Sequence, residues 1–336
     1  MATEMISTAV SHPNKAIVIY WGNSDDELNL PSRTSLSMTL QGVERPLDYT
    51  ATLQTAKGLD RDRVIIDGKE DKGEIYSELV RHLDEMRKLT HFKQNLIVST
   101  KTTFPIGSGL AGSAAAASAL AEAFAGLVKE ELSKEQISIM ARRGSGSAAR
   151  SVLGGFVKLA IGSDEQSIAI QISDENHWDL RDVIAVVDPG LKKIKSRDGM
   201  RMSTKTCPRD IYSRFVASAD NHVQDAQDAI VARDLPKLGE VYEFDSAFFR
   251  EVCMNTEPVL DYWSKSTADV FNTVTELRSE GVAIFAGTDA GPNVHIICDP
   301  SDAPKVAKSL DKLHVVKEII HARPGGPSLR SDNHLA

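Results

Sequence analysis

Residues 104–117 read F-P-I-G-S-G-L-A-G-S-A-A-A-A, a glycine-rich turn that runs directly into an alanine-rich segment. The alanine-rich part has strong helix propensity and contains no helix breaker before Gly126. A loop that enters a helix presents unpaired backbone N–H groups and the positive end of the helix dipole, so it can hold a phosphate without a cationic side chain. No Gly-Lys-Ser/Thr sequence closes the loop, which excludes a Walker A motif. From this loop alone, a phosphate site and an ordinary packing turn both remain open.

Strand-like runs dominate the chain before this loop. Residues 16–21 (A-I-V-I-Y-W) are β-branched and aromatic, and residues 35–40 alternate with period two, so we expect two antiparallel neighbours. Residues 72–89 have apolar side chains at helical spacing and predict a helix. Further strands are expected at residues 49–53, 64–66 and 96–98.

A second small-residue junction follows the alanine-rich helix. Residues 143–151 read R-G-S-G-S-A-A-R-S, after a predicted helix that begins with a capping box at residues 133–136 and ends near Arg142. Strands are expected at residues 156–161, 167–172 and 183–187, completing a mixed first lobe. Two such loops, each at a helix start, indicate an anion site more strongly than one.

The rest of the chain predicts a second lobe. Long helices are expected at residues 211–233, 236–252 and 260–279, and a shorter one at 303–313. Strands are expected at residues 282–286, 294–298 and 315–322. The predicted domains are residues 1–188 and 189–328, followed by a polar tail, 329–336, that we expect to be disordered.

Composition limits the class of protein. The chain has 336 residues, which is too long for most single cores, and its net charge of −8 argues against a general nucleic-acid or acidic-membrane surface. The three cysteines are scattered and odd in number, so we expect free thiols in a reducing compartment. Neither a signal-peptide pattern nor an apolar run of membrane-spanning length is present. We therefore expect a cytoplasmic protein without a metal site formed by its histidines or cysteines.

Several blocks occur in an order that resembles the diphosphomevalonate decarboxylases of the GHMP superfamily. The blocks are Tyr20-Trp21-Gly22 with Asp25, Glu27, Leu28, Leu30-Pro31 and Ser35-Leu36-Ser37, then residues 104–115, Gly144-Ser145-Gly146-Ser147-Ala148 with Arg150-Ser151, and Asp289-Ala290-Gly291-Pro292-Asn293. The resemblance implies a two-lobed α+β fold of mixed sheets and helices, with the active site in the cleft between the lobes. It also implies a homodimer in isoprenoid synthesis. Family members phosphorylate the 3-hydroxyl of 5-diphosphomevalonate with ATP, then release phosphate and CO2 to leave isopentenyl diphosphate.

The resemblance assigns two catalytic residues. Arg150 matches the arginine that binds the substrate carboxylate, for which a guanidinium offers a planar fork of two donors. Asp289 matches the catalytic aspartate beside the 3-hydroxyl. The alternatives are a structural salt bridge for Arg150 and, for Asp289, a hydrogen bond to the backbone of its own turn.

The remaining candidate residues bind the substrate or its phosphates. Helix capping is the alternative for their hydroxyls. The substrate candidates are Tyr20, Ser145, Ser147 and Met202, and the phosphate-binding candidates are Gly107, Ser108, Gly109, Gly112 and Ser113.

The chain also departs from the family. The usual Lys-Tyr-Trp-Gly-Lys block reads Ile19-Tyr20-Trp21-Gly22-Asn23 here, so both lysines are absent. In the family, the first lysine supports the catalytic aspartate and the second helps to hold the diphosphate. Gly112 stands where the family has the first of two serines.

These departures favour a changed reaction. We expect an enzyme most like the archaeal decarboxylases of mevalonate 3,5-bisphosphate, which release isopentenyl phosphate, CO2 and phosphate without ATP, because Ile19 can neither assist the aspartate nor neutralise a transferring phosphoryl group. The alternative is an ATP- and Mg²⁺-dependent decarboxylase of diphosphomevalonate or phosphomevalonate. A small-molecule kinase of the superfamily and a catalytically silent binding protein are more distant alternatives.

Overall fold

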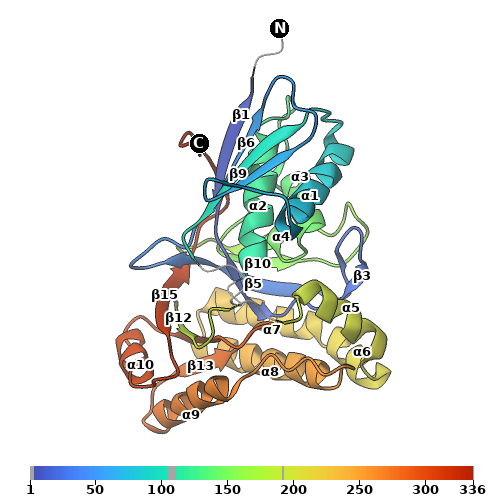
Figure 1. The fold of residues 1–336 in the computed structure, drawn as a ribbon. Helices are drawn as coiled ribbons and strands as arrows, with labels where there is room; N and C mark the ends of the chain where they lie inside the picture. Colours follow the sequence, from blue (N-terminus) through green and yellow to red (C-terminus); the bar gives the residue numbers. More distant parts are fainter. Residues whose placement is uncertain (1–3, 105–110, 191–192, 336) are drawn as a thin grey trace.

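Two large β-sheets, each with its own set of helices, form most of the molecule, and the computed structural model describes residues 4–104, 111–190 and 193–335. The first sheet has six strands, and only the pair β7 and β9 is parallel. In sheet order the strands are β16 (Leu329–Ser331), β1 (Ile6–Ser11), β6 (Tyr49–Thr55), β9 (Leu96–Thr102), β7 (Arg63–Ile66) and β8 (Lys69–Asp71). Helices α1 (Glu74–Thr90), α2 (Gly112–Ala125) and α3 (Lys134–Gly144) lie along one face of this sheet (Figure 1).

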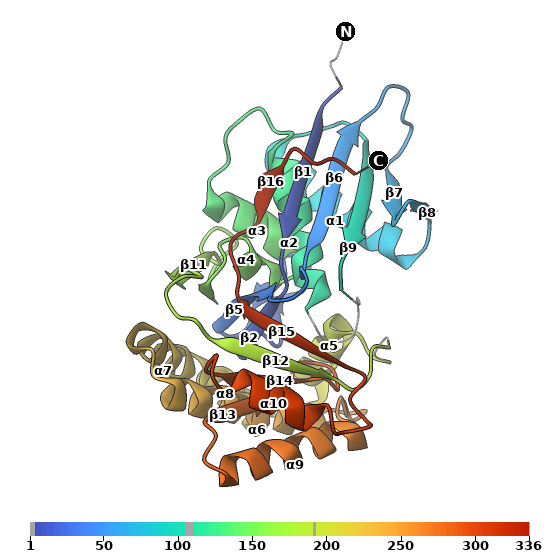
Figure 2. The ribbon, with the colours of Figure 1, turned by 90° about the vertical axis from the view of Figure 1, so that its left-hand side faces the viewer.

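The second sheet contains strands from both predicted lobes. Along its main path the order is β11 (Ala169–Ser173), β10 (Phe156–Leu159), β5 (Ser35–Gly42), β15 (Glu318–Pro324), β12 (Arg181–Val186), β14 (Val294–Cys298) and β13 (Ile284–Gly287), and β2 (Asn14–Val18) also pairs with β5. Figure 2 shows this sheet crossing beneath the first one. Because β5 pairs with β15, the two halves of the chain are joined through one continuous sheet.

The second sheet is covered by the C-terminal helices (Figure 2). These are α7 (Ala219–Ala232), α8 (Leu235–Met254), α9 (Lys265–Ser279) and α10 (Ala303–Leu310). Strands β3 (Asn23–Asp25) and β4 (Leu30–Pro31) pair as a small two-stranded sheet, and the buried one-turn helix α4 (Ala148–Ser151) packs against α2 and α3. The expected α+β class is confirmed. No helix within the described ranges is both long enough and apolar enough to cross a membrane.

The alanine-rich segment forms helix α2, as the sequence predicts, and this helix is buried on nearly all sides. Small side chains let it pack closely on β1 and β6, and Ser118 Oγ lies 2.5 Å from Ser11 Oγ on β1. Ala111, just before the helix, has a left-handed φ of 49°, so the chain turns sharply into α2. The predicted loop-to-helix junction is therefore present where the structure describes it.

The predicted disorder of the C-terminal tail is wrong. Residues Leu329–Ser331 form β16, which pairs with β1 at the edge of the first sheet. Ser328 is fully buried and its hydroxyl donates to Glu122 Oε2 on α2 at 3.3 Å. The tail is polar in sequence but ordered, because the open edge of β1 supplies backbone hydrogen-bond partners.

The second-lobe helices differ from their predicted bounds in three places. The helix expected at residues 211–233 is divided at Ser218 into α6 (Arg209–Ala217) and α7. The helix expected from residue 260 begins at Lys265, where Ser264 and Thr267 form a capping box. Residues 198–202, for which no helix was predicted, lie within helix α5 (Ser196–Thr206).

A buried histidine on α1 makes the stability of this fold depend on pH. His82 hydrogen-bonds Met140 O on α3 at 2.8 Å, and burial lowers the pKa of His82 to about 4. Between pH 4 and 6.5 the unfolded chain therefore binds more protons than the folded one, so the free energy of unfolding rises with pH and falls on acidification. The contribution is about 3 kcal/mol over this window.

We expect His82→Gln to flatten this dependence, because glutamine does not titrate. Chemical unfolding at pH 4.5, 5.5 and 6.5 measures it, and the exposed His314→Gln serves as the control. An unchanged slope in His82→Gln would show that the folded protein does not exclude the proton from this ring.

Candidate active site

A fully buried arginine without a carboxylate partner lies at the centre of the site. Arg150, on α4, donates from Nε to Ser37 Oγ at 2.8 Å, from Nη1 to Ser35 Oγ, and from Nη2 to Asn14 Oδ1 at 3.3 Å. No carboxylate of the described residues lies within ion-pair distance of this guanidinium. Burial lowers the pKa of Arg150 to about 10, and the charge of Asp289 partly offsets this effect. The alternative of a structural salt bridge at Arg150 therefore does not hold.

Asp289 lies in the turn between β13 and β14, and neighbouring side chains anchor this turn. Thr288 N donates to Ser246 Oγ at 3.1 Å, and Trp263 Nε1 donates to Thr288 Oγ1 at 2.9 Å. On the far side of the turn, Thr267 Oγ1 donates to Pro292 O at 2.7 Å. The position of the Asp289 backbone is thus fixed from two helices and a connecting segment.

The side chain of Asp289 forms an ion pair rather than bonding its own turn. Lys15 Nζ, on β2, donates to Asp289 Oδ1 at 2.6 Å. The Lys15 side chain is fully buried, whereas the Asp289 side chain is 21% exposed. The ammonium also lies over the ring of Tyr242, 5.1 Å from its centroid.

Lys15 supplies the cation that Ile19 cannot. The sequence left open whether a residue elsewhere in the fold replaces the missing lysine, and the ammonium that pairs with Asp289 comes from position 15. A lysine within a strand whose other residues are all buried was the available signal. The role of Lys15 could be inferred from this signal only if the contact between residues 15 and 289 were already known.

Tyr20 contacts Asn23, which stands where the resembled family has its second lysine. Its hydroxyl makes hydrogen bonds to Asn23 Oδ1 at 2.5 Å and to Asn29 O at 3.0 Å, and burial raises the pKa of Tyr20 well above its usual range. Asn23 Nδ2 in turn donates to Asp26 Oδ1 at 3.1 Å. The amide at position 23 is therefore engaged within the protein. Arg197, which the sequence analysis did not select, donates to Asn29 Oδ1 at 2.8 Å beside this group.

The glycines of residues 144–148 allow close packing. A Cβ on Gly146 would lie 2.2 Å from the Tyr20 ring, and one on Gly144 would lie 2.3 Å from the His82 ring. Ser145 and Ser147, on either side of Gly146, are half-buried, and their hydroxyls make no hydrogen bond within the described residues. Two unengaged hydroxyls thus lie in the same short loop as Arg150.

The other predicted residues are less closely associated with the site. Met202 packs with the apolar cluster around Trp21, whereas Met200 packs against both that cluster and the one around Tyr20. Gly112 and Ser113 form the first turn of α2, in which the helix has no acidic residue. Gly107, Ser108 and Gly109 lie outside the described residues.

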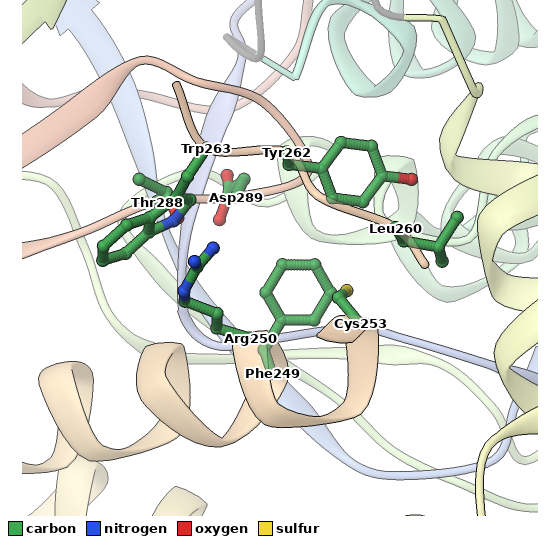
Figure 3. Close-up of a pocket in the computed structure, with 8 residues that line it drawn as sticks. All are labelled: Phe249, Arg250, Cys253, Leu260, Tyr262, Trp263, Thr288 and Asp289. Atoms are coloured by element: carbon green, nitrogen blue, oxygen red, sulfur yellow. The ribbon is translucent and has the colours of Figure 1, made fainter. Parts of the chain in front are cut away.

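A small cavity adjoins Asp289 on the side of α8. Its volume is about 10 Å³, roughly that of one water molecule. In Figure 3, the Arg250 side chain approaches Asp289 from below, and the Tyr262 hydroxyl points away from it. The cavity is lined by Phe249, Arg250, Cys253, Leu260, Tyr262, Trp263, Thr288 and Asp289. This volume is too small for a substrate, so a ligand must approach Asp289 from another side.

Together these residues form a compact charged site built from distant parts of the chain. Lys15 and Arg150 are positive and Asp289 is negative, so the three groups have a surplus of positive charge in buried surroundings. Such a surplus favours an anionic ligand, because the charges are poorly solvated without one. Within the described residues no group of three or more histidine, cysteine or acidic side chains could hold a metal ion.

Both halves of the chain match domain families of known proteins. Residues 11–169 match the diphosphomevalonate decarboxylase-like N-terminal domain, and residues 182–330 match the mevalonate 5-diphosphate decarboxylase C-terminal domain. The diphosphomevalonate decarboxylase of Candida albicans is 31% identical over 327 residues, which cover 92% of this chain and 88% of that enzyme.

Solved structures of mevalonate diphosphate decarboxylases have the same fold as this chain. The mevalonate diphosphate decarboxylase of Staphylococcus aureus aligns with a TM-score of 0.91 at 28% identity, covering 98% of this chain and 99% of that one. A structure described as MDDEF in complex with MVAPP, AMPPCP and magnesium aligns with a TM-score of 0.90 at 27% identity, covering 98% and 100%.

Proposed function

This chain belongs to the diphosphomevalonate decarboxylase family, whose members are carboxy-lyases, and from that premise we propose that it converts 5-diphosphomevalonate and ATP to isopentenyl diphosphate, ADP, phosphate and CO2. The relatives named for this activity support the substrate, and the MVAPP, AMPPCP and magnesium complex supports the use of a nucleotide. The expectation of an ATP-independent reaction therefore becomes the second candidate.

The observation that supports this proposal most strongly is the unpaired, buried charge of Arg150. Its three protein partners, Ser35, Ser37 and Asn14, are neutral and fix the plane of the guanidinium. A carboxylate of the substrate would complete the site as an ion pair in a medium of low dielectric, where such an interaction is strong. Binding of this kind restricts the carboxylate to one orientation, which decarboxylation requires.

Asp289 and Arg150 act on different groups of the substrate, the 3-hydroxyl and the carboxylate. Asp289 orients the 3-hydroxyl of the substrate and accepts its proton. ATP, when bound, supplies the phosphoryl group that makes the 3-oxygen a leaving group. Phosphate then departs with the C–O bonding pair, the bond from C2 to the carboxylate breaks, and its electron pair forms the alkene as CO2 leaves. Arg150 holds the departing carboxylate in position throughout, so a rigid pose contributes more than a strong base.

The described residues fit a bound polyphosphate. The first turn of α2 has no acidic side chain, and the turn at Ala111 directs the chain into the helix N-terminus. Within the described residues the backbone N–H groups of Gly112 and Ser113 have no hydrogen-bond partner, so they can bind phosphate oxygens. Since the described residues contain no preformed three-ligand cluster, Mg²⁺ would be held mainly by the phosphates, as is usual for this ion.

The second candidate is decarboxylation of mevalonate 3,5-bisphosphate without ATP. Position 23, where the resembled family has a lysine for the diphosphate, holds an asparagine engaged with Tyr20 and Asp26, which suits a smaller charge at C5. Lys15 weakens this candidate, because the cation whose absence suggested an ATP-free reaction is present beside Asp289. The CO2 released from each substrate, with and without ATP, distinguishes the two reactions.

A further inference from the structure

The Lys15 side chain has no solvent access, and among the described residues only one carboxylate lies within its reach. Its ammonium lies 2.6 Å from Asp289 Oδ1, and burying such a group unpaired would be costly. Its other neighbour is the Tyr242 ring, whose hydroxyl donates to His295 O at 3.2 Å and is therefore held in place. Lys15 is thus confined to one position.

The lysine side of this ion pair is buried, and the carboxylate side is partly exposed to solvent. Lys15 is 0% exposed and Asp289 is 21% exposed, so the pair faces solvent only through the carboxylate. Lys15 engages Oδ1, and within the described residues Oδ2 has no hydrogen-bond partner. An arrangement of this kind directs one carboxylate oxygen toward a ligand.

The start of β2 links the two charged groups of the site. Asn14 accepts from Arg150 Nη2 at 3.3 Å and also donates to Ser147 O and Ser151 Oγ, which fixes the loop around Arg150. The next residue, Lys15, holds Asp289. Two consecutive residues therefore set the position of the arginine and of the aspartate relative to each other.

Buried ion pairs contribute little net stability in many proteins, since desolvation offsets their attraction. A pair that joins residues 15 and 289 at the site of a buried, unpaired arginine is better explained by the orientation it imposes. We propose that Lys15 is the positioning residue of this enzyme: it fixes the orientation of the Asp289 carboxylate and presents Oδ2 to the substrate, from a position where the sequence alone indicated no such cation. This rests on the proposed function of the site.

The test begins with Lys15→Met, which keeps an unbranched side chain only one atom shorter and removes its charge. We expect kcat to fall at least about 100-fold while KM changes less than about fivefold, because the carboxylate is misdirected while substrate binding by Arg150 is retained. The control is Lys134→Met, which removes a lysine paired with Glu122 at 2.9 Å, away from the site. A kcat for Lys15→Met within about threefold of the wild-type value would overturn the proposal.

A second comparison covers the case in which Lys15→Met fails to fold. Lys15→Met/Asp289→Asn removes both charges of the ion pair, so neither partner is left buried without the other, and its residual single-turnover rate is compared with that of Asp289→Asn. If Lys15 acts only through Asp289, the two rates are equal. A further loss in the double variant would overturn the proposal.

The two proposals can fail separately. Absence of wild-type turnover on every phosphorylated mevalonate would refute the proposed function. The same set of variants, followed by thermal unfolding, would then decide whether Lys15 and Asp289 are coupled, and additive effects on unfolding would overturn the role of Lys15.

Discussion

Arg150→Lys is expected to fold and to lose about 30- to 1,000-fold in kcat/KM. Lysine keeps the positive charge but not the planar fork that Ser35, Ser37 and Asn14 hold in place. The expected loss corresponds to about 2–4 kcal/mol of transition-state stabilisation, the usual value of one well-placed charged donor. Steady-state CO2 release on the natural substrate measures it.

The matched control is Arg87→Lys. Arg87 is an equally specific donor, with Nη1 and Nη2 at 2.8 and 2.7 Å from the oxygens of Asp62, but it lies on α1 and has no contact with the site. Its replacement should lower the melting temperature slightly and leave kcat/KM unchanged. Wild-type kcat/KM in Arg150→Lys would remove Arg150 from the carboxylate site.

Asp289→Asn is expected to have the larger effect, a loss of at least about 1,000-fold in kcat with ATP and 5-diphosphomevalonate. Asparagine has the same shape but cannot accept the proton of the hydroxyl, and it leaves Lys15 buried without its carboxylate. Rapid-quench measurement of ADP formation in a single turnover tests the phosphoryl-transfer step directly.

The step that Asp289 serves can be separated with a substrate that is already phosphorylated at C3. If Asp289 acts on the hydroxyl alone, Asp289→Asn should release CO2 from that substrate at a rate close to that of the wild type. An equal loss on both substrates would contradict a role confined to the hydroxyl, and it would place the carboxylate in the elimination step as well.

Much of the fold follows from local patterns in the chain. The alanine-rich run predicts α2 through its helix propensity, and the apolar spacing of residues 72–89 predicts α1 through the face that this helix buries. Arg150 and Asp289 were predicted as catalytic residues from short motifs whose residues lie close together in the chain. Features of this kind need no knowledge of distant contacts.

The features that were missed depend on distant partners. Lys15 meets Asp289 across 274 residues, and β16 finds its partner in β1 at the opposite end of the chain. The division at Ser218 also lacks a local signal, since no glycine or proline marks it. In each case the structure was determined by tertiary contacts that local propensity does not describe.

ATP-dependent decarboxylation of 5-diphosphomevalonate is the reaction proposed for this chain. The most direct test is CO2 release from carboxyl-labelled 5-diphosphomevalonate, 5-phosphomevalonate and mevalonate 3,5-bisphosphate by purified, nucleotide-free protein, each with and without ATP and Mg²⁺. The proposal predicts CO2 from 5-diphosphomevalonate in preference to the others, only when ATP and Mg²⁺ are present, with ADP and CO2 formed in equal amounts. Release of CO2 from mevalonate 3,5-bisphosphate without ATP, at a rate above that of the ATP-dependent reaction, would contradict it.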